Sequence, residues 1–170
     1  MDIVELWIAQ VRMRAPDYLL HTNMNTITVL ENIFPCSDIG APCPMVLANE
    51  HIVHLGYYTP DDKVAVVVFN HCFSFKMSMP DENTISRHPL ALRGLLAYAS
   101  HLVEKSRWIT ELEARYKVIS NFSRDGRVYQ HYIFTFHDRT FECISSGYSV
   151  HLIENLSVTD ALIELKKQHS

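Results

Sequence analysis

The richest set of side chains able to do chemistry lies near the end of the chain. Two strand-like runs, 128–137 and 140–146, flank Asp138-Arg139, and this pattern predicts an antiparallel hairpin. With a two-residue loop, one face of the hairpin collects polar and ionisable side chains: His131, Thr135, His137, Thr140 and Glu142. General acid–base catalysis often pairs a carboxylate with an imidazole. Glu142 and His137, with His131 beside them, are therefore the candidate catalytic residues.

Two interpretations of this polar face are open. Antiparallel sheets commonly leave one face to solvent, where polar residues need no functional explanation. Alternatively, the face is the floor of a pocket, and Thr135 is one of its ligand-binding residues. The two interpretations differ in the expected effect of Glu142→Gln. The substitution should barely change stability on a solvated face, whereas a loss of folding would mean that the carboxylate is buried and paired.

Histidine is unusually common, with ten residues in 170. His51 and His54 form an H-x-x-H motif, but three residues along a strand place them on opposite faces, so they cannot share a metal ion. His71 falls inside the strand-like run 64–75 and is a candidate ligand-binding residue. His71, His137 and Glu142 could form a two-histidine, one-carboxylate set. Ten histidines produce many such sets by chance, so we assign neither a metal nor a cofactor.

The polar segment 79–93 is the second candidate binding region. It contains Arg87, His88 and Arg93, and Pro89 is suited to a first helical position. A polar loop that runs into a helix N-terminus can bind an anion, because unpaired N–H groups point outwards there. The alternative is an ordinary solvated loop.

Charge and hydropathy indicate which classes of partner are unsuited to this chain. The net charge is −4 and no basic run occurs, which disfavours nucleic acid. No apolar window approaches the length of a membrane-spanning helix, and the first residues lack the pattern of a signal peptide. The four cysteines form no C-x-x-C pair, which favours reduced thiols. We therefore expect a cytoplasmic protein without a membrane partner.

The remaining periodicities predict one α+β domain over residues 1–170. Helices are expected at 2–16, 26–34 and 89–105. A further helix is expected to begin after Ser106, which would cap it, and a last helix should run from Ser157 to about 168. Strands are expected at 45–48, 51–58, 64–75, in the hairpin and at 148–153. Together they suggest an antiparallel sheet of five to six strands, packed with N-terminal, central and C-terminal helices.

Several runs resemble a group of small uncharacterised bacterial proteins. The runs are His88-Pro89-Leu90 with Arg93-Gly94-Leu95, Ser106-Arg107-Trp108-Ile109, and 131–138 with 140–143. Similar "HPL…RGL", "S-x-W-I" and "FTFHD-x-TFEC" runs mark that group, and the resemblance covers about half of the chain. It implies a bacterial origin and carries no activity with it.

Two classes of function remain. The phosphate-binding and nucleophile-elbow motifs G-x-G-x-x-G, G-x-x-x-x-G-K-[ST] and G-x-S-x-G are absent from the sequence. One class is a non-catalytic module that binds a small ligand or a protein, with a homodimer through an aromatic surface as one form. The other is a small enzyme that uses the His/Glu face for acid–base or metal chemistry. The lack of a complete catalytic signature favours the first class and leaves the second open.

Overall fold

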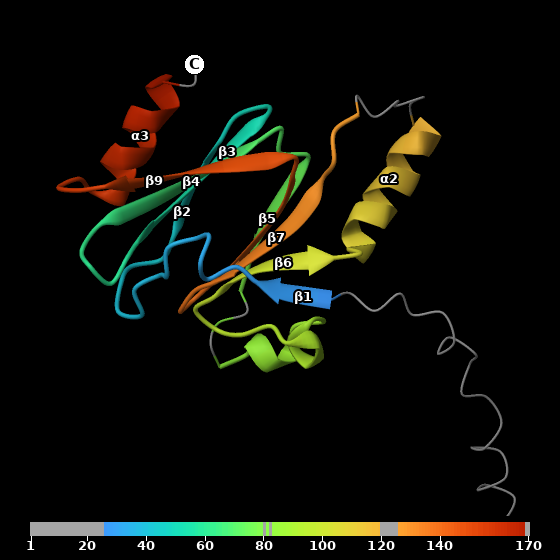
Figure 1. Ribbon diagram of the computed structural model, residues 1–170, viewed down its shortest axis with the longest axis horizontal. Coiled ribbons are helices and arrows are strands. Elements are labelled where there is room, and N and C mark those ends of the chain that lie inside the picture. Colours follow the sequence, from blue (N-terminus) through green and yellow to red (C-terminus); the bar gives the residue numbers. More distant parts are fainter. Residues whose placement is uncertain (1–25, 80, 82, 120–125, 169–170) are drawn as a thin grey trace, which may run out of the picture.

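Two antiparallel sheets form the body of the protein. The computed structural model describes residues 26–79, 81, 83–119 and 126–168. The five-stranded sheet runs in the order β1 (Thr26–Val29), β6 (Ser100–Glu104), β7 (Gln130–Thr135), β8 (Thr140–Ser145) and β5 (Ser74–Ser78). The four-stranded sheet runs in the order β2 (Met45–Ala48), β3 (Ile52–Tyr58), β4 (Val64–Asn70) and β9 (Gly147–Ile153). The predicted α+β class is confirmed, with two sheets in place of one (Figure 1).

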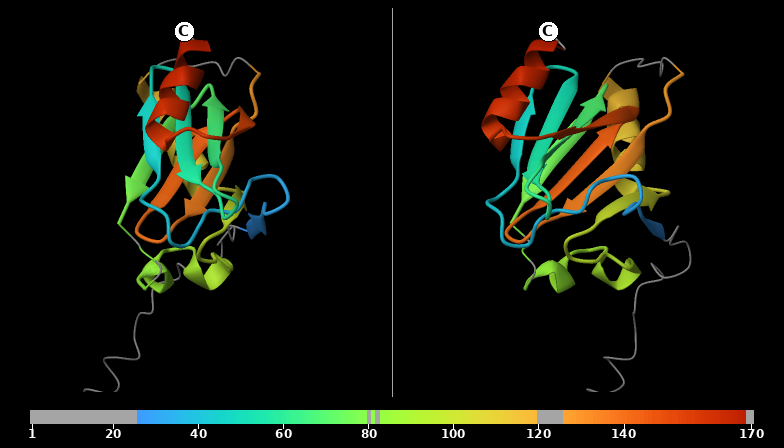
Figure 2. Two further views of the ribbon diagram at one scale, coloured as in Figure 1. Left: turned by 90° about the vertical axis from the view of Figure 1, so that its left-hand side faces the viewer. Right: turned by 60° about the vertical axis from the view of Figure 1, so that its left-hand side comes forward.

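The sheets pack face to face over an aromatic core, and Figure 2 shows them as two layers. Because successive side chains of a strand point to opposite faces, Tyr132 and Phe134 of β7 both face this core. Phe69 of β4 meets them from the other sheet, with its ring centroid 5.5 Å from that of Tyr132 and 5.8 Å from that of Phe141. Aromatic pairs at these separations add to the stability gained from burial.

The C-terminal helix α3 (Val158–Gln168), predicted from Ser157 to about 168, covers the outer face of the four-stranded sheet (Figure 1). Ser157 caps it, because its Oγ accepts the Asp160 N–H at 3.2 Å and donates to the Asp160 carboxylate at 2.6 Å. Gly56 of β3 lies directly under the helix. A Cβ at this position would stand 2.8 Å from Cγ1 of Val158, so the close approach of helix and strand requires glycine.

The helix α2 (Arg107–Ile119) begins after Ser106, as predicted, with the Ile109 N–H donating to the Ser106 hydroxyl at 3.3 Å. The helix predicted at 2–16 lies outside the described residues. No helix within the described ranges is long and apolar enough to cross a membrane.

Two predicted helices are wrong. Thr26–Val29 forms the edge strand β1, where β-branched residues suit a pleated backbone. The run 89–105 contains a short 3-10 turn, Ala91–Arg93, followed by strand β6. Helical spacing of leucines was misleading here, because Leu92 is 98% exposed and Leu96 is 51% exposed. The strand β6 has no period-2 alternation in its sequence, SHLVE, and its place in the sheet comes from its pairing with β1 and β7.

Two strand details also differ from prediction. The run 64–75 is two strands in different sheets, joined by a turn at residues 71–73. His71 lies in that turn, exposed and with a left-handed φ of 49°, so it is not on an apolar strand face. The hairpin loop has four residues in place of two. Thr135 pairs with Thr140 and the Phe136 N–H donates to the Arg139 carbonyl at 2.8 Å, so Ile133, not Thr135, is opposite Glu142.

Candidate functional site

Strand pairing brings ionisable side chains into one row on the outer face of the five-stranded sheet. His101 of β6 pairs with Ile133 of β7, Ile133 pairs with Glu142 of β8, and Glu142 pairs with Lys76 of β5. His131 lies two residues before Ile133 and therefore on the same face. Three strands and two neighbouring segments supply the group of contacting side chains that we call the Glu142 cluster: Lys76, His88, Ser106, His131 and Glu142.

This face is covered, so the solvent-facing interpretation is wrong. Residues 83–96 cross it, and their Leu90 and Leu95 pack on Val103 and Ile133. Figure 1 shows this segment, with its two short helical turns, below strands β1 and β6. Glu142 retains only 2% of its surface. Thr135, predicted to bind a ligand, is also buried and fixes the cover, since its Oγ1 donates to the Leu96 carbonyl at 2.7 Å.

Glu142 is held by three groups. Its Oε2 accepts a hydrogen bond from Nε2 of His131 at 3.0 Å. Its Oε1 lies 2.9 Å from Nζ of Lys76 and 3.4 Å from Nε2 of His88. The side chains of His131 and His88 are 4% and 7% exposed, whereas that of Lys76 is 49% exposed and reaches in from solvent. The carboxylate is therefore enclosed by donors on both oxygens.

These contacts decide the charge of Glu142. Burial alone would raise the pKa of the carboxyl group, but the hydrogen bonds from His131, His88 and Lys76 outweigh it and hold the pKa well below its ordinary value of 4.5. The group is ionised at every pH at which the fold is expected to operate. Efficient proton transfer needs a pKa close to the working pH, so Glu142 is poorly suited to act as a general acid or base.

His131 continues the network towards α2. Its Nδ1 lies 2.8 Å from Oγ of Ser106, so Ser106, His131 and Glu142 form a chain of three hydrogen-bonded groups. Trp108 packs edge-on against the His131 ring, with centroids 5.1 Å apart, and Nζ of Lys76 lies 4.7 Å from the centre of the Trp108 ring. The chain of groups resembles a serine hydrolase triad in composition, but Ser106 is only 4% exposed and already caps α2.

His88 ties the covering segment to the sheet. Its Nδ1 accepts the Leu90 N–H at 3.2 Å, which leaves the ring proton on Nε2, directed at Glu142. Arg87 and Arg93 are exposed at the ends of two 3-10 turns, Ile85–Arg87 and Ala91–Arg93, outside the cluster. The chain beyond Pro89 forms a three-residue turn in place of the predicted helix, so the basis for the anion site is lost.

His137 lies apart from Glu142, so the predicted acid–base pair is wrong. It follows the end of β7 in the hairpin loop and is exposed. Its Nδ1 lies 2.9 Å from Oη of Tyr98, and its Nε2 lies 3.7 Å from Oδ1 of Asp138. The set of His71, His137 and Glu142 is likewise not assembled. Across the described ranges, no group of three or more His, Cys, Asp or Glu side chains is placed to hold a metal ion.

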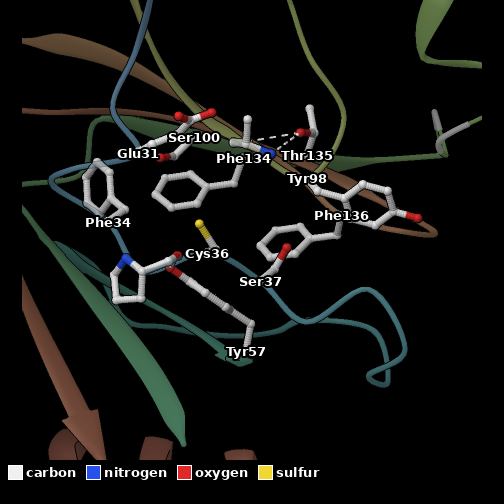
Figure 3. Close-up of a pocket in the computed structure, with 12 residues that line it drawn as sticks. Glu31, Phe34, Cys36, Ser37, Tyr57, Tyr98, Ser100, Phe134, Thr135 and Phe136 are labelled. Carbon is white, nitrogen blue, oxygen red and sulfur yellow. Dashed lines mark hydrogen bonds between the residues drawn. The ribbon is translucent and has the colours of Figure 1, made fainter. Parts of the chain in front are cut away.

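His137 instead belongs to an open hollow that we call the aromatic groove. It consists of two adjoining shallow hollows at one end of the sandwich, each open to solvent and with about 10 Å³ of space for a water-sized molecule. Ser37, Tyr57 and Phe136 line both. Figure 3 shows the rings of Phe34, Tyr57, Phe134 and Phe136 around the first hollow, with the Cys36 thiol between them.

The walls of the groove are well anchored. Phe34 is buried, and its ring centroid lies 4.8 Å from that of Phe134. The hydroxyl of Tyr57 donates to the Pro35 carbonyl at 2.8 Å and so fixes the loop that closes one side. Burial raises the pKa of Tyr57, which keeps this donor protonated. The sequence prediction missed the groove, because its walls come from segments 31–44, 57–58, 98–100 and 134–138, and no local motif joins them.

Comparison with known proteins finds no similarity on which to base a function. A scan against protein-family models finds no match, and searches of curated proteins and of solved structures find none either. Function is therefore inferred from the geometry of the Glu142 cluster and the aromatic groove.

Proposed function

We propose that this chain is a non-catalytic binding module that holds a small ligand in the aromatic groove. One contrast carries the proposal. The ionisable groups of the Glu142 cluster are enclosed and bound to one another, whereas the groove opens to solvent at the edge of the buried aromatic core. Small-molecule sites are typically concave, mostly apolar and supplied with a few polar groups for orientation. The groove has this composition.

The test is a screen of small organic fragments against the full ¹⁵N-labelled chain, followed by two-dimensional amide NMR. Ser37 lines both hollows, and Ser37→Trp would fill them. Ser86 is exposed on the covering segment, so Ser86→Trp is the matched control. We expect hits to shift amides around the groove, to lose binding in Ser37→Trp and to keep it in Ser86→Trp. Hits that map elsewhere, or bind both variants equally, would overturn the proposal.

A second candidate is a small enzyme, favoured by the Ser106–His131–Glu142 chain of hydrogen bonds. An acyl-transfer enzyme would use Ser106 as nucleophile, with His131 taking its proton. Treatment with a fluorophosphonate and mass measurement separates the two functions. The binding module is expected to remain unlabelled at Ser106, because this hydroxyl is buried and already bonded. A stoichiometric adduct at Ser106, absent from Ser106→Ala, would favour the enzyme.

We also propose that the protein acts in the reducing cytoplasm of a bacterium. Its four cysteines, Cys36, Cys43, Cys72 and Cys143, are all free thiols, which suits such a compartment. Titration of the native and unfolded chain with a thiol reagent should count four thiols after purification under air-free conditions. A lower count in the unfolded chain would point to disulfides and an oxidising compartment.

A homodimer through strand β5 is the oligomeric form we propose. This strand ends the order of the five-stranded sheet, and it exposes Phe75, Met77 and the following Met79 on one side. Two copies paired antiparallel about Met77 would align these apolar side chains and place Lys76, whose charge is matched by Glu142, opposite Ser78. Light scattering should give twice the chain mass for the wild type and the single mass for Met77→Lys. A monomeric wild type would exclude this dimer.

A further inference from the structure

Two of the four cysteines, Cys72 and Cys143, lie in contact although they are far apart in the sequence. Cys143 belongs to strand β8, and its side chain is buried in the aromatic core between the sheets. Cys72 lies in the turn between β4 and β5 and packs against the same core. The thiol of Cys143 donates a hydrogen bond to the sulfur of Cys72. The two sulfur atoms are therefore close enough to react with each other.

The turn that carries Cys72 is fixed to both sheets. The Cys72 N–H donates to the His51 carbonyl at 2.8 Å, directly before strand β3 of the four-stranded sheet. The N–H of Phe73 donates to the Ile144 carbonyl at 2.8 Å, next to Cys143 on strand β8 of the five-stranded sheet. The position of Cys72 beside Cys143 is therefore set by backbone hydrogen bonds.

The two thiols differ in exposure and in acidity. Cys72 is half-buried and within reach of a small molecule, whereas Cys143 is fully buried. The hydrogen bond from Cys143, with a further one from the backbone of Ser74, outweighs burial and lowers the pKa of Cys72 below the ordinary thiol value of 9.0. Burial raises the pKa of Cys143. Because the thiolate is the nucleophilic form, Cys72 is suited to react first and Cys143 to supply the second sulfur.

We propose that Cys72 and Cys143 form a site of reversible oxidation, at which a hydroperoxide converts the two thiols into a disulfide. The sulfur of Cys72 attacks one peroxide oxygen, the O–O bond breaks, and the leaving hydroxide takes up the Cys72 proton, which gives water and a sulfenic acid. The sulfur of Cys143 then attacks the sulfur of Cys72 and the S–O bond breaks. The hydroxide released takes up the Cys143 proton to form a second water. The thiols lose two electrons in total, and the peroxide gains them.

The site is separate from the proposed ligand site. Among the described residues that line the aromatic groove, neither Cys72 nor Cys143 occurs, so the inference stands without the groove ligand. In a reducing compartment, disulfides are usually transient and serve catalysis or redox sensing. A disulfide here would be reduced again by a small thiol, and while present it would join the turn at residues 71–73 covalently to β8.

Disulfide mapping tests the pairing on the full wild-type chain. The reduced protein is treated with equimolar hydrogen peroxide, blocked with N-ethylmaleimide in urea, and digested with trypsin for mass spectrometry. Cleavage after lysine and arginine separates the relevant thiols into three peptides: 64–76 with Cys72, 140–166 with Cys143, and 15–63 with Cys36 and Cys43. The same treatment of the urea-unfolded chain is the control.

We expect the native chain to give peptides 64–76 and 140–166 joined as the main oxidised product, and dithiothreitol to separate them. Peptide 15–63, whose two thiols are exposed, is expected to stay reduced. In urea the preference should disappear, because it depends on the fold. Oxidation confined to 15–63, or the same mixture of disulfides in the native and the unfolded chain, would overturn the proposal.

Two variants test the order of attack. Cys143→Ala removes the second sulfur, so the sulfenic acid of Cys72 should persist and be trapped by dimedone. In Cys72→Ala the buried Cys143 is expected to remain unlabelled. Cys36→Ala is the control and should form the same disulfide as the wild type. Dimedone on Cys143 in Cys72→Ala, with none on Cys72 in Cys143→Ala, would overturn the assigned roles, and the wild-type mapping decides the pairing even if Cys143→Ala does not fold.

Discussion

Replacing Glu142 by glutamine isolates the contribution of the buried charge. The substitution keeps the shape of the side chain and removes its negative charge. Nε2 of His131 and of His88 then face an amide, which offers one acceptor oxygen and presents a competing donor. Lys76 is half exposed and can turn to water, so its loss of partner costs little. The expected damage therefore comes from the two enclosed histidines.

A buried donor that loses its partner costs about 1–3 kcal/mol. Two such donors, one partly satisfied by the amide oxygen, give an expected loss of about 3 kcal/mol at pH 7. This loss agrees with the lower end of the range for breaking a buried ion pair. It would be a large fraction of the about 5–15 kcal/mol by which a domain is stable. The variant is expected to fold, with a clearly lower urea midpoint.

Urea unfolding followed by far-UV circular dichroism measures this loss, with exposed Glu164→Gln on α3 as control. The pH dependence gives a second check. The pKa of Glu142 in the fold lies below its ordinary value of 4.5, so its stabilisation is complete above that value and is lost as the pH falls below it. The gap between wild type and Glu142→Gln should narrow below pH 4.5. A gap under about 1 kcal/mol at pH 7, or one that stays constant in acid, would refute the account of the cluster.

Three further predictions concern other positions. Burial lowers the pKa of His101 from 6.5 to about 4, so the unfolded chain binds one more proton than the folded chain between these pH values. At about 1.4 kcal/mol per pH unit, acidification from pH 6.5 to 4 should lower the free energy of unfolding by about 3 kcal/mol. The variant His101→Phe should lack this part of the pH dependence in urea titrations. Ser106→Ala removes the cap of α2 and a partner of His131, and calorimetry should register a loss of about 1–2 kcal/mol. Gly56→Ala forces a Cβ against Val158, and we expect thermal melting to reveal a destabilisation of about 1–3 kcal/mol; an unchanged melting temperature would contradict the close approach of α3.

The hairpin shows what a period of two can predict. The loop has four residues in place of two. Each residue of β7 therefore pairs with the β8 residue two positions earlier in the sequence than predicted. A shift of two leaves every side chain on its original face, whereas a shift of one would reverse them all. His131, Thr135 and Glu142 therefore share a face, as predicted. His137 does not join them, because the longer loop places it beyond the end of the strand.

Burial of that face was not predictable from the hairpin alone. The cover comes from residues 83–96, whose leucine spacing is that of an amphipathic helix. In the structure only part of these leucines is buried: Leu90 and Leu95 pack on the sheet, while Leu92 is almost fully exposed. The decisive contact is His88 on Glu142, across 54 residues of sequence, and no local pattern encodes such a pair. Long-range packing here overrides the local helical signal.

The residues with the strongest catalytic appearance are thus used to hold the fold together, and this determines where a ligand can act. Glu142 and His88 fix the covering segment to the sheet, and Thr135 fixes its end at Leu96 and Ala99. Tyr98 lies between those last two residues and lines the groove. The buried cluster and the groove are therefore linked through one segment of the chain. The contacts of Glu142 and Thr135 fix the segment that carries Tyr98 into the lining of the groove. A general acid or base needs a pKa near the working pH, and the contacts that lower the pKa of Glu142 instead suit a structural role.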